Sequence, residues 1–252
     1  MMEFTYSAYE SIIDLLRENK YEFADYHKYE LYDKCVILRH DVDYDLKKTI
    51  QMAELENKNG VSATYFVLAT SGFYNVMSKE SKKVIGYLQS LGHKIGLHFD
   101  EANYDITEET WCSKKINELI KQELTVLNSV MEKETCMSIS MHRPSKQTLE
   151  SNLYIEGIAN AYSKEYFRNF KYLSDSRMHW REDPIRVIQS KKHNRIQLLT
   201  HPFWYFDEPK DMKNIIYDFL YGKENAEYRY KTFSENFSRL GDVLTIEEAR
   251  EK

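Results

Sequence analysis

An apolar run that ends in two carboxylates constrains the fold of this chain more than any other segment. Residues 36–43 read Val-Ile-Leu-Arg-His-Asp-Val-Asp. Because side chains alternate between the faces of a β-strand, a strand here places Arg39, Asp41 and Asp43 on one side. Two neighbouring carboxylates are costly to bury unless a cation or a shared proton compensates them. The segment therefore predicts a strand that delivers a metal or acid–base site, in preference to a simple helix cap, a role that Asp45 suits better.

Strand-like apolar runs and amphipathic helical stretches alternate along the rest of the chain, which is typical of βα units around a parallel sheet. Helices are predicted over 45–59 and 78–91, from Thr107 onward, and within residues 1–34. Seven or eight strands favour a barrel or distorted barrel over a small open sheet. The strands are expected at 36–43, 61–68, 93–98, 136–141, 158–161, 172–174, 185–189 and 196–200.

The composition indicates one α/β domain and excludes several classes of partner. The 252 residues are 42% hydrophobic and 30% charged, which provides for a sizeable core. The net charge of −5 comes from interspersed signs without a basic block, so no nucleic-acid partner is expected. No run approaches the roughly 20 apolar residues of a membrane span. The N-terminus lacks signal-peptide features and the three cysteines are scattered, so we expect a cytoplasmic protein with reduced thiols.

The same pattern gives an expected domain organisation. Residues 1–252 are read as one domain, with the barrel at about 35–206 and a packed helical extension over 207–252. The extension is predicted to be helical through Leu240. No Pro/Gly/Ser-rich linker separates it from the barrel.

Two histidines are the first and last residues of the predicted strand at 93–98. Strand alternation puts His93 and His98 on opposite faces, so only one of them can enter a common site. His98 stands at the strand's end beside an acidic loop, at the same relative height as Asp41 and Asp43. We therefore expect His98 to be a ligand or catalyst and His93 to make a structural hydrogen bond.

Two further strands end in residues that carry chemistry. Residues 140–145, Ser-Met-His-Arg-Pro-Ser, bring an imidazole and a guanidinium together. Arg143 is predicted to hold a carboxylate in its ionised form and lower its pKa, the alternative being a surface salt bridge. His201 ends the last strand, where a general acid would face the same rim. The aromatic residues after it would cover the barrel edge or line a substrate pocket, and they are Phe203, Trp204 and Tyr205.

Taken together and in order, these segments resemble the motifs of the polysaccharide deacetylase family. The resemblance runs from about residue 35 to 205. It implies a deformed (β/α) barrel that removes an acetyl group from an N-acetylated sugar with a divalent metal, for which zinc is the expected ion. The matching segments are Arg39-His-Asp-Val-Asp43, TYFVL at 64–68, Gly-His-Lys-Ile-Gly-Leu-His at 92–98, His-Arg-Pro at 142–144 and Leu-Leu-Thr-His at 198–201.

The resemblance also implies roles for individual residues. Asp41 matches the family's catalytic base, whereas Asp43 and His98 match its metal ligands. Arg143 matches the arginine that orients the base, and His201 resembles the histidine that protonates the departing amine. The remaining expectations are a supporting role for Asp175 and substrate contacts for Trp180, Trp204 and Tyr205.

One position departs from the family's pattern. The second histidine ligand, expected four positions after His98, is Ala102 here. Because a hydrolytic metal site takes about three protein ligands plus an exchangeable water, another residue must complete this one. An oxygen from the acidic residues after the strand, or an imidazole swung inward, is expected to do so, and the candidates are Asp100, Glu101 and His142, with His201 also available.

The predicted function is therefore metal-dependent N-deacetylation of a sugar or of a nucleotide- or lipid-linked sugar precursor, as in surface-polysaccharide assembly. The lack of an export signal motivates the precursor. Two alternatives stay open. Another metal-assisted hydrolase, acting on a different amide or ester, could use the same scaffold. With Ala102 in a ligand position, the chain could also be a non-catalytic carbohydrate-binding protein.

Overall fold

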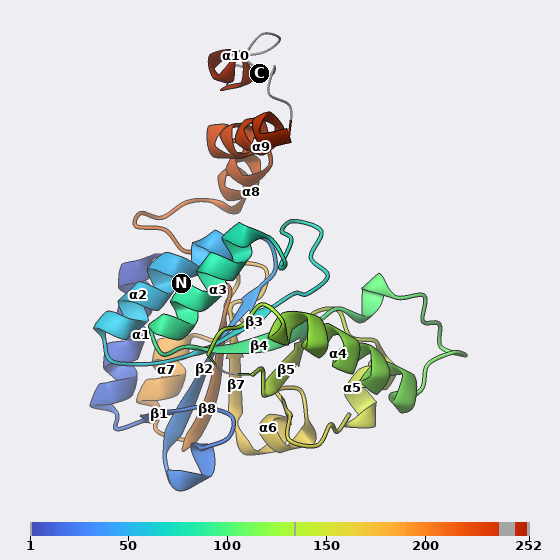
Figure 1. Cartoon of the computed structure of the whole chain (residues 1–252). Helices are drawn as coiled ribbons and strands as arrows, with labels where there is room; N and C mark the ends of the chain where they lie inside the picture. The colour runs from blue at the N-terminus through green and yellow to red at the C-terminus, as the bar shows by residue number, and fades with distance from the viewer. Residues whose placement is uncertain (1, 134, 237–244, 251–252) are drawn as a thin grey trace. The chain divides into compact units, whose positions relative to one another are not determined.

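The predicted barrel is confirmed as a curled sheet of parallel strands flanked by helices (Figure 1). The computed structural model describes residues 2–133, 135–236 and 245–250. The strand order is β6-β5-β4-β3-β2-β8-β7, β1 also pairs with β2, and these pairings are parallel. The strands are β1 Glu22–Ala24, β2 Cys35–Val42, β3 Thr64–Val67, β4 Lys94–Phe99, β5 Ser138–Met141, β6 Ala159–Asn160, β7 Lys171–Ser174 and β8 Arg195–Thr200.

Side-chain contacts across the sheet show how far it curls. Strands β2 and β5 lie three places apart in the sheet, which would separate them by about 14 Å if the sheet were flat. The guanidinium of Arg39 on β2 nevertheless donates a hydrogen bond to the hydroxyl of Ser140 on β5. The same guanidinium lies over the rings of Phe66 and Tyr162, at 5.0 and 5.4 Å from their centroids. The inner face of the sheet thus closes around Arg39.

The helices begin and end largely where the sequence signals predict. The carboxylate of Asp45 accepts a hydrogen bond from the backbone of Lys47. The hydroxyl of Ser78 caps the helix that begins at Lys79 by accepting a hydrogen bond from the backbone of Ser81. Gly60 and Gly92, with φ of 65° and 90°, follow two helix ends. The helices of this part are α1 Tyr6–Glu18, α2 Thr49–Lys58, α3 Lys79–Ser90, α4 Ser113–Asn128, α5 Lys146–Ser151, α6 Lys164–Asn169 and α7 Pro184–Gln189, with 3-10 turns at Tyr29–Leu31, Leu46–Lys48, Glu101–Asn103 and Pro202–Trp204.

Two local predictions are wrong for identifiable reasons. The run 185–189, expected as a strand, lies in helix α7, because Pro184 occupies the first turn and the carboxylate of Asp183 caps it. The helix expected from Thr107 begins only at Ser113. The hydroxyl of Thr107 accepts a hydrogen bond within a local turn instead of capping a long helix.

The N-terminal segment is only partly the helix that was expected over residues 1–34. Ile12, Ile13 and Leu16 are fully buried along α1, as the apolar stripe predicts. The chain then turns at Lys20, which has a φ of 65°, and enters the short strand β1. The three-residue strand was missed because it is too short to show a period of two.

The chain divides into two compact units, residues 1–207 and 208–252. The second unit contains the helices predicted for it, of which the described part ends at Asn236, so that 237–240 of the prediction lie outside the described residues. No helix in the described ranges is long and apolar enough to cross a membrane. The helices of this unit are α8 Met212–Tyr221, α9 Lys223–Asn236 and α10 Ile246–Arg250.

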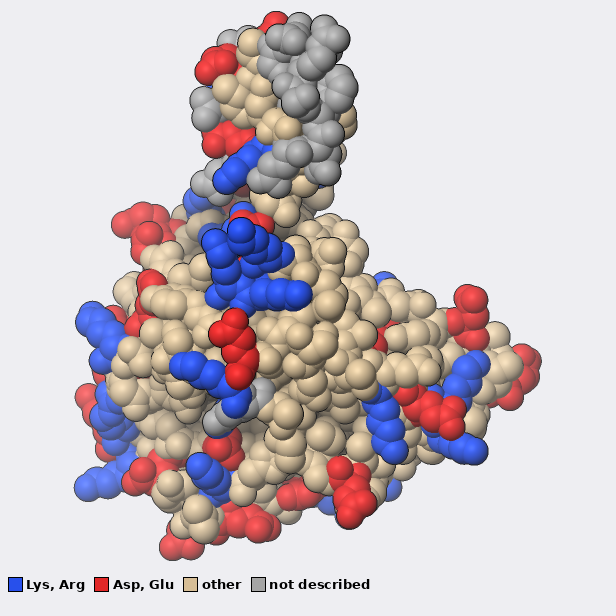
Figure 2. All heavy atoms as spheres, in the orientation of Figure 1, with Lys and Arg blue, Asp and Glu red and all other residues tan. Residues whose placement is uncertain are grey.

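Charges of both signs are spread over the face of the molecule that Figure 2 shows. Lys and Arg side chains lie among Asp and Glu side chains, with wide uncharged areas between them. Ion pairs account for part of this pattern, for example Lys47 with Glu80 at 2.9 Å. The surface charge on this face is therefore mixed, in keeping with the interspersed signs of the sequence.

Glu123 on α4 is a buried carboxyl group that contacts the loops after β3 and β4. Only 3% of it is exposed, and it accepts hydrogen bonds from the hydroxyls of Tyr104 at 2.5 Å and Thr70 at 3.4 Å. Burial raises the pKa of Glu123 to about 7, although both hydrogen bonds lower it. The folded chain thus holds a proton on this side chain up to near-neutral pH.

We predict that the free energy of unfolding of the barrel unit falls as the pH rises from about 4.5 to 7. The reason is that the unfolded chain releases the Glu123 proton at a lower pH than the folded chain does. Glu123→Gln keeps the size and removes the charge. It should flatten this part of the pH profile and raise the free energy of unfolding at pH 8 by about 2 kcal/mol. Urea unfolding at pH 5 and pH 8 measures both quantities, and an unchanged pH slope in the variant would contradict the prediction.

Candidate active site

Three side chains from three strands meet at the carboxyl end of the barrel. Asp43 follows β2, His98 lies in β4 and His142 follows β5. Oδ1 of Asp43 is 3.2 Å from Nε2 of His98 and 3.2 Å from Nδ1 of His142, and the two nitrogens are 3.2 Å apart. The carboxyl ends of parallel strands share one edge, which is why residues so distant in sequence converge. Three donor atoms therefore form a nearly equilateral triangle.

The triangle fits a divalent metal ion. Ligand atoms at 2.0–2.1 Å from a tetrahedral zinc ion would lie roughly 3.3–3.4 Å apart, close to the observed edges. Oδ1 of Asp43 is buried and has no hydrogen-bond partner within the described ranges, which is costly for a carboxylate without a cation. Burial raises the pKa of Asp43, but His142 and His98 bring it well below its usual range, so this oxygen is ionised. One carboxylate and two imidazoles suit zinc and leave a fourth position open.

Among the candidates for the donor missing at Ala102, His142 is the one that the structure brings to the triangle, in the described part of the chain. The oxygen ligands favoured from the sequence are engaged elsewhere. Asp100 accepts hydrogen bonds from Nε of Arg143 at 3.0 and 3.1 Å, and Glu101 accepts hydrogen bonds from the hydroxyls of Ser145 and Thr148 at 2.8 and 2.6 Å. The expectation of an oxygen donor from these two acids is therefore corrected.

Asp41 lies beside the triangle and is ionised. Its Oδ2 is 3.7 Å from Nε2 of His98, and only 3% of the residue is exposed. Nη2 of Arg39 donates to both of its oxygens, at 2.8 and 2.6 Å. Burial raises the pKa of Asp41, but the charge of Arg39 outweighs this together with nearby histidines and lowers it below its usual value. Asp41 is thus a carboxylate poised next to the predicted metal position.

The arginine that holds Asp41 is not the one predicted from the sequence. Arg143 pairs with Asp100 at the rim, where 57% of its side chain is exposed. Arg39, which is fully buried, holds Asp41 instead. Arg39 lies two residues before Asp41 on the same strand and the same face, so its side chain runs along the barrel interior to the carboxylate. The two-residue spacing of Arg39 and Asp41 is visible in the sequence, and it was the signal that these two residues pair.

His201 also lies beside the triangle. Its Nε2 is 3.8 Å from Oδ2 of Asp43, and its Nδ1 is bonded to Asp175 at 2.6 Å. Asp175 is fully buried and also accepts a hydrogen bond from the backbone of His201. Burial lowers the pKa of His201, but the charge of Asp175 raises it to about 9. The imidazole is therefore protonated at neutral pH, with Nε2 directed toward the site.

The three aromatic residues expected to contact substrate differ in position. Tyr205 is fully buried, and its hydroxyl donates to Asp175 at 3.1 Å, so it lies behind the site and does not line a pocket. Trp204 is 6% exposed and contacts Tyr44. Trp180 is 5% exposed. The expectation for Tyr205 is corrected, because a residue without exposed surface cannot touch substrate.

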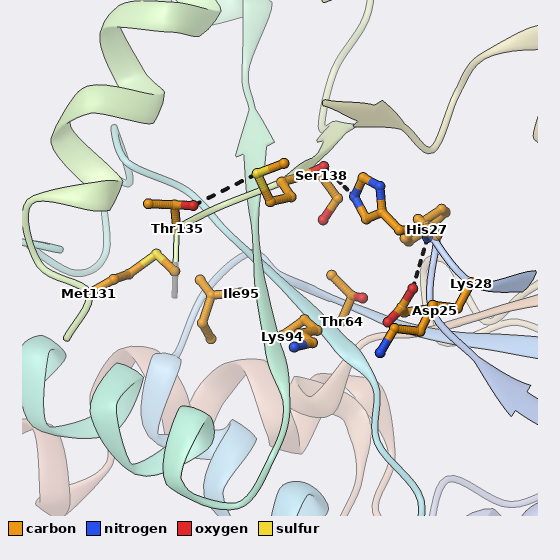
Figure 3. A pocket seen from close by; sticks show the side chains of 11 residues that line it. Asp25, His27, Lys28, Thr64, Lys94, Ile95, Met131, Thr135 and Ser138 are labelled. Atoms are coloured by element: carbon orange, nitrogen blue, oxygen red, sulfur yellow. Dashed lines mark hydrogen bonds between the residues drawn. The ribbon is translucent and has the colours of Figure 1, made fainter. Parts of the chain in front are cut away.

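A separate cavity of about 190 Å³ lies at the other end of the barrel (Figure 3). Thr64, Lys94 and Ser138, which begin β3, β4 and β5, form part of its lining. Nε2 of His27 bonds the carbonyl of Met137 at 2.9 Å, so the loop after β1 closes over this end. The amino end of a barrel contributes to stability rather than to chemistry, and the triangle is at the carboxyl end.

No protein-family model and no curated protein matches this chain. Solved structures that match include the catalytic domain of peptidoglycan N-acetylglucosamine deacetylase from Eubacterium rectale, with 17% identity over 77% of this chain and 86% of that chain, and a TM-score of 0.48. A family 4 carbohydrate esterase from Bacillus anthracis matches with 16% identity, over 87% of this chain and 86% of that chain, and a TM-score of 0.42.

A CE4 family pseudoenzyme from Bacillus anthracis also matches, with 13% identity over 75% of this chain and a TM-score of 0.41. This chain spans only 61% of that pseudoenzyme, and 57% of a mutant of it with restored activity. These solved structures are of the class that the sequence motifs resemble. At such identities and TM-scores they carry no argument about activity, which rests on the geometry of the site.

We predict that His142→Ala weakens zinc binding by more than about 100-fold, since the loss of residues that merely orient ligands already costs 10- to 100-fold. Asp100→Asn, which removes the charge of the alternative carboxylate donor, should leave the zinc affinity within a few-fold of the parent. Titration calorimetry with zinc measures both. Equal zinc affinity in His142→Ala and the parent would remove His142 from the ligand set.

A second prediction concerns the buried ion pair. Arg39→Met should cost about 3–5 kcal/mol of unfolding free energy, because it leaves Asp41 charged and unpaired in the barrel. The double variant with Asp41→Asn should recover much of this loss. Arg143→Met should cost less than Arg39→Met, because 57% of the Arg143 side chain is exposed and water reaches this end of its pair with the buried Asp100. Urea unfolding measures these three variants, the parent and the single variant Asp41→Asn, and purely additive losses would argue against the coupling.

Proposed function

We propose that this chain is a metal-dependent hydrolase that removes the N-acetyl group from a sugar. The observation that carries the proposal is the triangle of Asp43, His98 and His142, with an ionised carboxylate and a protonated imidazole beside it. Asp41 and His201 supply those two groups. Hydrolysis of an amide needs both a base for the attacking water and an acid for the leaving nitrogen.

The residues divide the reaction between them. The chemistry supplied by a bound divalent cation is Lewis acidity toward the acetyl carbonyl and toward water. Asp41, held by Arg39, accepts a proton from the water whose oxygen bonds to the carbonyl carbon. The C–N bond then breaks, and Nε2 of His201 donates a proton to the departing nitrogen. The products are acetate and a free amine.

Opposite environments support these two assignments. Asp41 meets the positive charge of Arg39, which keeps it deprotonated, whereas His201 meets Asp175, which keeps it protonated. Pairs of titratable groups whose pKa values are driven apart in this way are characteristic of acid–base catalysis. Asp175 also fixes the orientation of the imidazole, because it accepts a hydrogen bond from Nδ1–H and leaves Nε2–H directed to the site.

The sugar and the metal are proposed from different observations. The order of motifs that resemble polysaccharide deacetylases supports an N-acetylated sugar, and a nucleotide- or lipid-linked precursor in the cytoplasm stays a prediction from sequence. The donor set of two imidazoles and one carboxylate supports zinc. The non-catalytic alternative loses its main motive, because His142 supplies the third donor that Ala102 lacks.

We predict that Asp41→Asn keeps the metal but lowers the rate of acetate release by about 10²- to 10⁴-fold, the usual contribution of a general base. Zinc content and acetate release from N-acetylated sugars measure the two effects. Arg186→Met, which removes a surface charge from a side chain 87% exposed on α7, serves as a control and should retain the rate.

Acetate release at the parent rate by Asp41→Asn would show that another group is the base. A hydrolase of a different amide or ester is the second candidate, because a fold does not determine the substrate. Simple acetate esters assayed beside acetylated sugars separate the two, since a deacetylase of sugars should prefer the latter.

A further inference from the structure

Two aromatic rings lie in the segments that follow β2 and β3, at the end of the barrel that holds the metal-binding triangle. Tyr44 immediately follows Asp43, and its ring is 5.5 Å from that of Phe73 at an interplanar angle of 71°. Tyr44 also lies 4.8 Å from the ring of Phe203. Phe73 is 56% exposed. The two rings together form an apolar surface at the carboxyl end of the barrel, which we call the mouth of the site.

The loop that carries Phe73 is fixed at both of its ends. The hydroxyl of Tyr74 donates to the carbonyl of Val42 at 2.8 Å and accepts from the backbone of Leu68 at 2.9 Å. On the other side, the amide of Asn103 donates to the hydroxyl of Thr70 at 2.9 Å. These bonds tie the loop to the end of β2 and to the turn after β4.

The backbone around Phe73 is itself ordered. The N–H groups of Phe73 and Tyr74 both donate to the hydroxyl of Ser71, at 3.1 and 3.3 Å. An exposed ring on an anchored loop has already lost most of its conformational freedom, so a ligand that contacts it does not have to order it. Phe73 is thus preorganised for binding.

The polar side of the mouth complements these rings. Arg143 follows His142 directly, and it uses Nε and Nη2 for Asp100, which leaves Nη1 without a hydrogen bond to any described residue. A ligand at this end of the barrel can therefore contact both aromatic rings and an N–H donor. A pyranose has apolar C–H faces and a rim of hydroxyl groups, and it matches this combination.

We propose that Phe73 and Tyr44 bind the pyranose ring of the substrate by stacking, beside the triangle that receives its N-acetyl group. This inference rests on the proposed function and extends it, because it assigns the sugar-recognition surface. The hydroxyl groups of the same ring lie toward Arg143. Tyr44 is held from behind by Phe203, so Phe73 is the more accessible of the two rings.

Binding without turnover tests the surface directly. In zinc-loaded Asp41→Asn protein, the Kd for the β-1,4-linked trimer of N-acetylglucosamine is measured by titration calorimetry. Adding Phe73→Ala should raise this Kd roughly three- to tenfold, the value of one aromatic contact. Phe73→Trp should restore the affinity. Phe167→Ala, which removes an aromatic ring 46% exposed on α6, should leave the Kd unchanged.

Zinc affinity should be equal in all these proteins, which separates loss of stacking from damage to the triangle. If the trimer does not bind, or if Phe73→Ala binds it as tightly as its parent, the stacking surface is overturned. Binding of adenosine in preference to the trimer, lost on Phe73→Ala, would also overturn it in favour of a nucleobase.

Catalytic assays distinguish the two proposals. In protein that retains Asp41, Phe73→Ala should raise KM for the trimer and leave kcat within twofold. If the trimer binds through Phe73 but no acetate is released, the proposed function fails and the sugar-recognition surface stands. If acetate is released and Phe73→Ala leaves KM unchanged, the sugar-recognition surface fails and the proposed function stands.

Discussion

The buried pair of Arg39 and Asp41 is the interaction on which the rest of the barrel depends. A charged side chain in the interior must be paired, because neither ion alone can recover its lost hydration. Arg39 makes this pair and also bonds Ser140, so a single guanidinium connects β2 with β5 across the barrel. Phe66 and Tyr162 contact it as well. The curl of the sheet and the ionised state of Asp41 therefore have the same cause.

The opposite face of β2 carries a second buried polar network. Glu56 is fully buried and accepts hydrogen bonds from Tyr9 at 2.6 Å, Tyr65 at 2.7 Å and His40 at 2.8 Å. His40 is bonded in turn to Thr200 on β8, at 2.7 Å. His40 and Thr200 each immediately precede a side chain of the site. Satisfied polar networks of this kind are rigid, so the outer face holds two neighbouring strand ends in register for the chemistry on the inner face.

Much of the site was predictable from strand periodicity, and the remainder depended on curvature. A period of two was enough to put Arg39, Asp41 and Asp43 on one face, and to separate His98 from His93, whose ring nitrogens instead bond backbone groups. The same period carried the signal that Arg39 holds Asp41, although the resemblance gives this role to Arg143. The convergence of His142 with Asp43 and His98 depended instead on curvature, because β2 and β5 lie three places apart in the sheet. The run 185–189 failed for a different reason, because short apolar runs do not distinguish helix from strand.

The proposed metal site would draw its donors from three strand ends. Ligands four positions apart would come from one segment, whereas Asp43, His98 and His142 lie in or directly after β2, β4 and β5. His142 reaches its place because its backbone N–H donates to Phe99 at 2.9 Å, which continues the pairing of β4 with β5 beyond Met141. A donor set spread in this way exists only when all three strands are in register, and the free energy of metal binding then becomes part of the free energy of folding.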